Sequence, residues 1–219
     1  RWCACWQRSE PSAPSFSLAS SICSTELESD LGLIDYPIDP LLPELCAQVT
    51  PGQTVLLQAP PGAGKTTRVP LALMERAPGR IWMIEPRRLA TKAAAARLAE
   101  TLGEPVGQRI GYAVRGEQRR SEATVVEVIT DGLFLRRLQA DPSLDGISCV
   151  IFDEFHERRR DADLALALLR DAIPLLRPDL AVVLMSATLD LSDLRDRLPN
   201  AKVLESEGRS YPVETHHLA

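Results

Sequence analysis

The chain has 219 residues, of which 45% are hydrophobic and 25% charged, a composition typical of a globular protein with a sizeable core. Its formal net charge of -5 and pI of about 5.3 exclude a protein that binds nucleic acid through an overall positive charge, so any basic surface must be local. Because it shows neither an apolar run of about 18 residues nor a signal peptide, we expect a cytoplasmic protein that does not enter a membrane.

The first 36 residues differ in composition from the rest of the chain. They are rich in serine and show no hydrophobic period of a strand or a helix, so we expect a flexible, disordered leader over residues 1–36. The five cysteines lack the paired C-x-x-C spacing of a zinc site. We therefore expect reduced thiols rather than a metal or redox pair.

Strand and helix signals alternate after the leader. A short amphipathic helix is predicted near residues 40–49. The predicted strands lie at 54–59, 80–85, 125–130, 147–154 and 181–187, with a further one in the GYAV that precedes Arg115. The predicted helices lie at 64–77, 86–103, 131–140 and 161–173. This alternation predicts an α/β fold in which a mainly parallel sheet lies between helices.

A glycine-rich turn, APPGAGKTT (59–67), follows the first predicted strand. In a phosphate-binding loop of the type G-x-x-x-x-G-K-[ST], the glycines let successive backbone N–H groups face the phosphates, and the following helix adds its positive end. Gly62 and Gly64 occupy the tight part of this turn. The first glycine of the pattern is replaced by Ala59, which we place at the end of the strand, where a methyl group fits.

The residues that follow the turn supply further groups for a nucleotide. Lys65 is expected to bridge the β- and γ-phosphates, and the Thr66 hydroxyl is expected to bind Mg²⁺. The expected nucleotide contacts are Gly62, Ala63, Gly64, Lys65, Thr66 and Thr67. A turn rich in proline and glycine, followed by an incidental Lys-Thr pair, is the alternative.

Two adjacent carboxylates end the apolar strand in CVIFDEFHERR (149–159). Ligands of open α/β sheets bind at the carboxyl edge of the strands, where this pair would lie. Asp153 suits a hold on Mg²⁺ through a water molecule, and Glu154 suits the orientation or deprotonation of an attacking water. A solvated acidic turn is the alternative, and the phosphate loop argues against it.

Five short motifs occur in an order and spacing that resemble one enzyme family. APPGAGKTT, EPRRLA, ITDGLFLRRL, DEFHER and MSATLD look like motifs I, Ia, Ib, II and III of the DEAH-type helicases of superfamily 2. Phe155 in DEFH, the wording PPGAGKTTRVPLAL and the run DADLALALL are similar to the bacterial HrpB helicases. The resemblance covers residues 37–219. It implies a RecA-like P-loop domain over 37–209 that binds ATP and Mg²⁺.

The resemblance assigns further roles residue by residue. His156 of motif II, which we place among the catalytic residues, and Ser186 and Thr188 of motif III are implied to couple the state of the γ-phosphate to movement against a neighbouring domain. Arg97, in the helix after motif Ia, is implied to stack on the adenine, which would discriminate weakly among nucleoside triphosphates. An ordinary exposed helical arginine is the alternative at this position.

The resemblance also implies a surface for single-stranded nucleic acid. Residues at the ends of strands would track the nucleic-acid backbone without reading its bases. RNA is the expected kind of strand, and DNA is left open. The implied contacts are Arg87, Arg88, Arg115, Thr130, Asp131 and Gly132.

Residues 210–219 resemble the start of a linker into a second RecA-like domain, which this sequence does not contain. The expected function is that of the first motor domain of an ATP-dependent helicase. Two alternatives stay open: a nucleotide-binding module without efficient turnover, and a P-loop ATPase unrelated to nucleic acid.

Overall fold

The computed structural model describes residues 36–187 and 192–206, which belong to one of the two compact units of the chain. Residues 1–35 of the predicted leader lie outside the described residues, as do the predicted linker at 210–219 and Thr188. What the sequence predicts for them stays a prediction.

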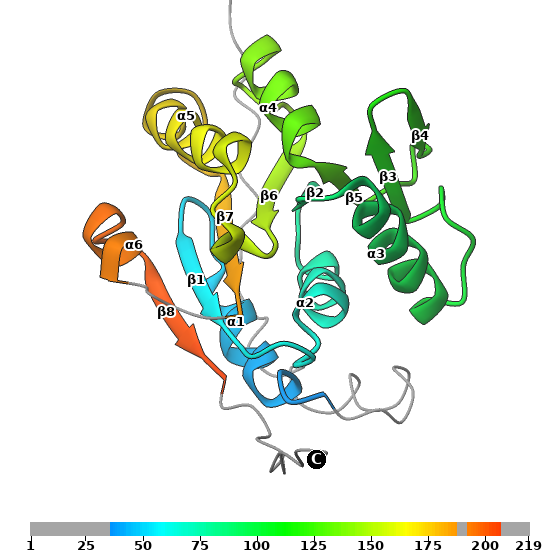
Figure 1. Cartoon of the computed structure of the whole chain (residues 1–219), viewed down its shortest axis with the longest axis horizontal. Coiled ribbons are helices and arrows are strands. Elements are labelled where there is room, and N and C mark those ends of the chain that lie inside the picture. The colour runs from blue at the N-terminus through cyan, green and yellow to red at the C-terminus, as the bar shows by residue number, and fades with distance from the viewer. Residues whose placement is uncertain (1–35, 188–191, 207–219) are drawn as a thin grey trace, which may run out of the picture. The chain divides into compact units, whose positions relative to one another are not determined.

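An eight-stranded sheet forms the middle layer of the described unit (Figure 1). The strands lie in the order β4-β3-β5-β2-β6-β7-β1-β8, and neighbouring strands are parallel except for β3 and β4. The strands are β1 Thr54–Gln58, β2 Arg80–Glu85, β3 Ile110–Val114, β4 Glu117–Arg119, β5 Val126–Thr130, β6 Ile147–Phe152, β7 Ala181–Ser186 and β8 Lys202–Glu205. The predicted mainly parallel sheet is confirmed.

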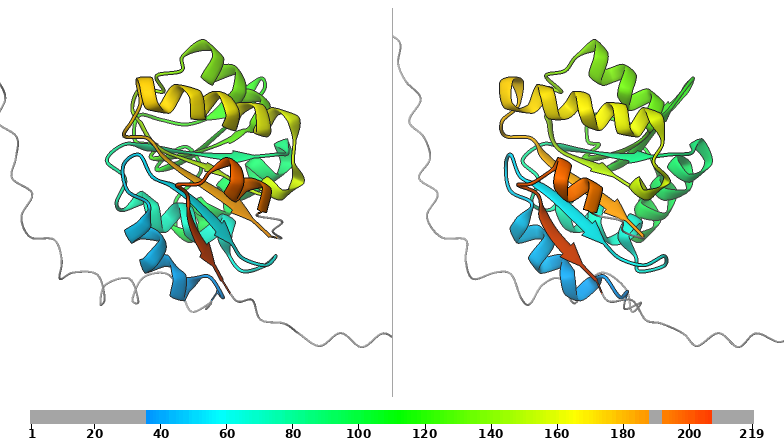
Figure 2. Two further views of the ribbon diagram at one scale, coloured as in Figure 1. Left: turned by 90° about the vertical axis from the view of Figure 1, so that its left-hand side faces the viewer. Right: turned by 60° about the vertical axis from the view of Figure 1, so that its left-hand side comes forward.

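Helices cover both faces of this sheet. Helix α2 packs against α1 and α3, and α4 packs against α5. Figure 2 shows α1 and α2 on one side of the sheet and α4 and α5 on the other. The helices are η1 Asp39–Leu41, α1 Leu42–Gln48, α2 Lys65–Met74, α3 Arg88–Thr101, α4 Asp131–Ala140, η2 Phe155–Glu157, α5 Arg160–Leu176 and α6 Ser192–Arg197. The α/β class is therefore confirmed, with helices on both sides of the sheet.

A row of four aromatic rings connects the core to the turn that follows β6. Trp82 lies edge to face with Phe134 at 6.0 Å, Phe134 with Phe152 at 5.7 Å, and Phe152 with Phe155 at 5.8 Å between ring centroids. Such T-shaped pairs are favourable because the positive edge of one ring meets the negative face of the next. Phe155 is 3% exposed, so packing anchors the short helix η2 to the core.

Some predicted boundaries and elements differ from the structure. The strand predicted to run to 154 ends at Phe152, because Glu154 has the left-handed φ of 49°, which no strand continues. The helix predicted from 86 starts at Arg88, because Arg87 has extended backbone angles. Strand β4 was not predicted, since its three residues are exposed and polar and leave no apolar run. Strand β8 was also missed, because Leu204 is its one fully buried residue.

Candidate functional site

The predicted phosphate loop connects the carboxyl end of β1 to the start of α2. Gly62 and Gly64 have φ values of 77° and 94°, which favour glycine. A Cβ built on Gly64 would lie 2.9 Å from side-chain atoms of Tyr36, so the loop also passes too close to that ring for a larger residue. A Cβ built on Gly62 meets nothing within 4 Å. The loop therefore packs against Tyr36 at Gly64, whereas the space beside Gly62 is open.

Lys65 is turned back onto the loop that precedes it. Its ammonium donates hydrogen bonds to the carbonyl oxygens of Ala59 at 2.5 Å and Pro60 at 3.0 Å. Burial lowers the pKa of Lys65, while the charges of Glu154 and Asp153 oppose that shift. Phosphate oxygens are stronger acceptors than these neutral carbonyls, so an anionic ligand in the loop would compete for the same ammonium.

Ala59 belongs to the sheet rather than to the open turn. Its side chain is fully buried, and its N–H donates to the carbonyl of Ser186, the last residue of β7, at 3.1 Å. This placement supports the expectation that the methyl group lies outside the part of the loop that faces phosphate.

Thr66 and Asp153 join the loop to the acidic pair. The Thr66 hydroxyl donates to Asp153 Oδ2 at 2.6 Å, although the two residues are far apart in the sequence. Asp153 Oδ1 accepts from the N–H of Glu154 at 2.8 Å, and the N–H of Asp153 donates to the carbonyl of Ile84 at 2.9 Å. Burial raises the pKa of Asp153, and its hydrogen bonds oppose that shift.

This pair of oxygens fits Mg²⁺. A hydroxyl and a carboxylate are hard ligands, and Mg²⁺ at phosphate sites needs few protein ligands because phosphates and waters complete its shell. In the described ranges 36–187 and 192–206, no group of three or more His, Cys, Asp or Glu side chains is placed to hold a metal ion. A magnesium ion here would therefore depend on the oxygens of Thr66 and Asp153 together with those of a bound nucleotide.

Glu85 is a third carboxylate at this edge, which the sequence analysis did not assign. It ends β2, is 3% exposed, and hydrogen-bonds to Asp153. Burial and the charge of Asp153 raise the pKa of Glu85 to about 9, so at neutral pH it keeps its proton and donates a hydrogen bond to the Asp153 carboxylate. The sequence does contain a signal for this residue. Glu85 is a carboxylate at the carboxyl end of the apolar strand RIWMIE, just as Asp153 is a carboxylate at the carboxyl end of β6.

The turn after the acidic pair brings together residues assigned to motifs II and III. His156 Nδ1 lies 3.4 Å from Glu154 Oε2 and accepts a hydrogen bond from the N–H of Ala187 at 3.3 Å. Ser186 is buried at the end of β7, directly before Ala187. Burial, and secondarily Asp153, raises the pKa of Glu154. The structure thus places the candidate base, His156 and the start of motif III in contact.

Arg87, Arg88 and Arg115 gather where α3 begins and β3 ends. Arg88 donates to the carbonyl of Arg115 at 3.2 Å, which ties motif Ia to the loop after β3. Arg87 donates to Glu157 at 2.7 Å, and 68% of its side chain is exposed. Their role as phosphate contacts stays a prediction, which the exposure of Arg87 supports.

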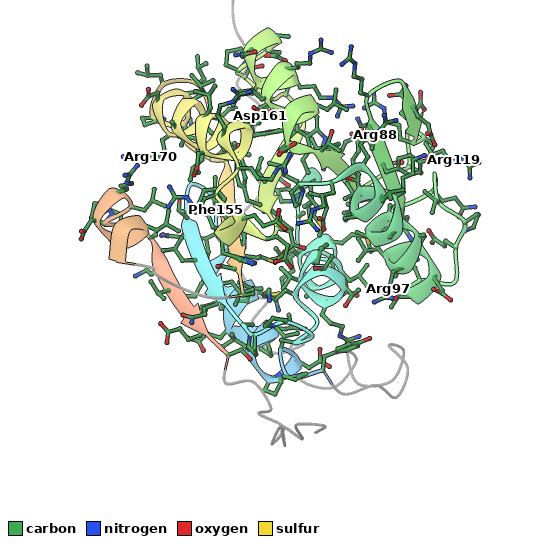
Figure 3. All side chains as sticks on the ribbon, in the orientation of Figure 1. Arg88, Arg97, Arg119, Phe155, Asp161 and Arg170 are labelled. Carbon is green, nitrogen blue, oxygen red and sulfur yellow. The ribbon has the colours of Figure 1, made fainter. Side chains whose placement is uncertain are left out.

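Arg97 lies further along α3, away from this group. Its side chain is exposed, and Figure 3 shows Arg88 and Arg97 towards opposite ends of the helix. No contact described for Arg97 brings it to the phosphate loop, so its predicted stacking on a base stays a prediction.

The carboxylate of Asp131 is held by contacts within the domain. This carboxylate is 5% exposed, accepts from the N–H of Gly132 at 2.7 Å, and pairs with Arg159 at 2.6 Å. Gly132 lies under the first turn of α5, since a Cβ there would lie 3.2 Å from Asp161. Thr130, the last residue of β5, is also buried. These contacts favour a supporting role for the Asp131 side chain, and backbone contacts of this segment with nucleic acid stay a prediction.

Replacing Arg159 with methionine is expected to destabilise the domain by about 2–4 kcal/mol, because it leaves the buried Asp131 carboxylate without its cation. Equilibrium unfolding in urea would measure this loss. Arg158→Met is the matched control, since Arg158 pairs with the partly exposed Asp163 and such a pair contributes about 1 kcal/mol or less. Equal stabilities of the two variants would contradict the supporting role of the Arg159 pair.

A phosphate loop after β1, joined to an acidic pair after β6, defines a P-loop nucleotide-binding domain. Residues 43–196 match the family model described as DEAD/DEAH box helicase, and the chain belongs to this family.

Its relatives include the ATP-dependent RNA helicase HrpB of Escherichia coli K12, with 48% identity over 184 residues. The match covers 83% of this chain and 23% of that protein. An ATP-dependent RNA helicase HrpA homolog of Haemophilus influenzae is 35% identical, and 14% of it is covered. The crystal structure of E. coli DEAH/RHA helicase HrpB superposes with a TM-score of 0.79 and 48% identity, over 82% of this chain and 23% of that one. The chain thus spans less than a quarter of the length of these relatives.

Among the residues that the structure describes, no helix combines the length and the apolar character that crossing a bilayer requires.

Proposed function

We propose that this domain binds Mg-ATP in the phosphate loop and hydrolyses it, and that hydrolysis drives the remodelling of a single strand of RNA. The observation that carries the proposal is the 2.6 Å hydrogen bond between Thr66 and Asp153, which joins the loop to the acidic pair. Neither motif alone distinguishes a nucleotide site from an ordinary turn. Together they supply the loop, the metal ligands and a candidate base at one edge of the sheet.

Each residue then has a role that its position supports. The backbone of residues 62–64 and the ammonium of Lys65 bind the phosphates, while Thr66 and Asp153 hold Mg²⁺, which would neutralise phosphate charge. Glu85 holds Asp153 in place through its hydrogen bond. Glu154 orients or deprotonates the attacking water, and its raised pKa makes it a stronger base than an exposed glutamate.

The strand is assigned to RNA because both curated relatives named above are called RNA helicases. The arginines at the start of α3 and after β3 are the candidate contacts to its phosphates. Steady-state ATP turnover with and without single-stranded RNA, measured on a polypeptide that continues through the second domain, tests the proposal. Turnover that RNA does not change would favour a P-loop ATPase unrelated to nucleic acid.

A partner domain belongs to the same proposal. We infer that a second RecA-like domain completes the motor, because the relatives continue far beyond the matched segment. Without it, the domain would act as a nucleotide-binding module with little turnover.

Lys65→Ala is expected to weaken the binding of Mg-nucleotide by roughly tens of times, because it removes a charge-assisted phosphate contact worth about 1.5–3 kcal/mol. Ala59→Gly is the control, and we expect it to change affinity by less than about twofold, because Ala59 is buried in the sheet. Titration with a fluorescent nucleotide measures both. If Ala59→Gly strengthened binding as much as Lys65→Ala weakened it, position 59 would belong to the phosphate-binding turn.

A further inference from the structure

Arg87 and Glu157 form an ion pair between the proposed nucleic-acid surface at the start of α3 and the proposed nucleotide site. The guanidinium donates to Glu157 Oε1 at 2.7 Å, with 68% of the Arg87 side chain and 25% of the Glu157 side chain exposed. Arg87 precedes the first residue of α3, whereas Glu157 ends η2, the turn that follows the acidic pair. The pair therefore joins a proposed phosphate contact to the segment that carries the candidate base.

A phosphate of a bound strand can replace Glu157 as the partner of Arg87. A carboxylate and a phosphate are both anionic acceptors for the same guanidinium, and a phosphate can also accept two hydrogen bonds from it at once. Because exposed ion pairs contribute little free energy, breaking this one costs little. Glu157 thus occupies Arg87 in the way that a strand would.

Release of Glu157 would act on Glu154 through one tight turn. The N–H of Glu157 donates to the carbonyl of Glu154 at 2.9 Å. Glu154 and Arg158, which flank η2, have left-handed φ values of 49° and 46°, so the turn is held in a conformation that non-glycine residues rarely adopt. Such a segment shifts when a restraint on it is removed.

The same turn contacts the elements that surround the nucleotide site. Helix η2 packs against β7, and Phe155 lies next to that strand (Figure 3). His156 receives a hydrogen bond from Ala187 and lies 3.4 Å from the carboxylate of Glu154. The position of Glu157 is therefore connected by short contacts to the residues of motifs II and III.

We propose that Arg87 and Glu157 form a latch, in which Glu157 holds Arg87 until a strand phosphate displaces it and the released turn repositions Glu154. Both are positioning residues in this inference, which rests on the proposed function because it requires a strand at Arg87. The latch would make the affinity for the strand and the state of the nucleotide site depend on each other.

A double-mutant cycle on strand binding tests the latch. A fluorescein-labelled single-stranded oligouridylate is titrated with the wild type, Glu157→Gln, Arg87→Ala and the double variant, and anisotropy gives each Kd. Glu157→Gln is expected to tighten binding by about three- to fivefold, because Arg87 no longer has a competing partner. In the Arg87→Ala background the same change should give at most about half of that factor, since only general repulsion is relieved.

Glu104→Gln is the matched control for charge. It removes one negative charge and an ion pair with Arg109, but it lies after the opposite end of α3. We expect its Kd to stay within about 1.5-fold of the wild type, given the screening of exposed charges by salt.

The second measurement is the linkage between strand and nucleotide. The Kd for the same oligouridylate is measured with and without Mg²⁺ and a non-hydrolysable ATP analogue. For the wild type, the Kd values without and with the nucleotide should differ by about fivefold or more. In Glu157→Gln, the logarithm of this ratio should be at most half of the wild-type value. A merely structural role of Glu157 would leave this ratio unchanged.

The outcomes separate the latch from the proposed function. If the wild type binds the strand and Arg87→Ala weakens binding, but the cycle is additive or the linkage ratio does not move, the latch is overturned and the proposed function stands. If no variant binds the strand, both fail. Non-additivity together with a reduced linkage ratio supports the latch.

Discussion

In a polypeptide that also contains the second RecA-like domain, Glu154→Gln is expected to lower ATP hydrolysis by roughly two or more orders of magnitude, the scale of general-base catalysis, while Mg-nucleotide still binds. The amide keeps the size of the side chain but cannot accept a proton at neutral pH. The contacts of Asp153 support the role of Glu154 as the base. Thr66 and Glu85 hold the Asp153 carboxylate in the place proposed for the metal, so Glu154 is the carboxylate available to the attacking water. Single-turnover release of phosphate, with protein in excess over nucleotide, measures hydrolysis even when it is slow.

The control for this substitution is Glu44→Gln, an exposed glutamate in α1. It should leave both binding and hydrolysis unchanged, which shows that loss of one carboxylate as such has no effect. If Glu154→Gln hydrolysed ATP at the rate of the wild type, Glu154 would have no part in the mechanism. If it abolished nucleotide binding, its role would be in holding the metal or the phosphates instead.

The parts of the site that could be predicted from the sequence are those encoded by local patterns. The phosphate loop is a short segment with two glycines directly before a helix, and the acidic pair directly follows an apolar run. Both patterns place their residues at the carboxyl end of a β-strand. The parallel sheet then brings the ends of β1 and β6 to one edge, which explains why the bond between Thr66 and Asp153 follows from the fold class.

The parts that could not be predicted depend on partners far apart in the sequence. The pairing of the buried Asp131 carboxylate with Arg159 is one example, and the predicted nucleic-acid contact at Asp131 stays a prediction. Nothing local to either residue indicates that pairing. The same holds for Arg87 and Glu157, which are 70 positions apart and meet because β2 and β6 are neighbours in the sheet.

The arginines around the acidic pair also indicate what this domain does not supply by itself. Arg87 is bound to Glu157, Arg159 to Asp131 and Arg158 to Asp163. In the described part of the chain, each of these three arginines is thus paired with a carboxylate. Lys65 is the cation that faces both Asp153 and Glu154. Arginine fingers stabilise the charge of the transition state in phosphoryl transfer, so we expect further cations to come from another domain.

Joining the domain to a second RecA-like domain is therefore expected to raise RNA-stimulated ATP turnover by about 10³–10⁵-fold, the range that arginine fingers supply. The 219-residue chain should bind Mg-nucleotide, hydrolyse it near background, and bind a strand weakly and with strong dependence on salt, because in the proposed motor the strand is held between two domains. Turnover and duplex unwinding are measured for the chain alone and for the chain followed by the second domain.

Lys65→Ala in the two-domain polypeptide is the control for this comparison, because it should remove the gained turnover and so show that hydrolysis occurs at the loop described here. Rapid, RNA-stimulated turnover and unwinding by the 219-residue chain alone would show that Lys65, Mg²⁺ and the arginines of this domain stabilise the transition state without help. In that case the ion pairs of Arg87, Arg158 and Arg159 would have to open during catalysis to supply cations in addition to Lys65.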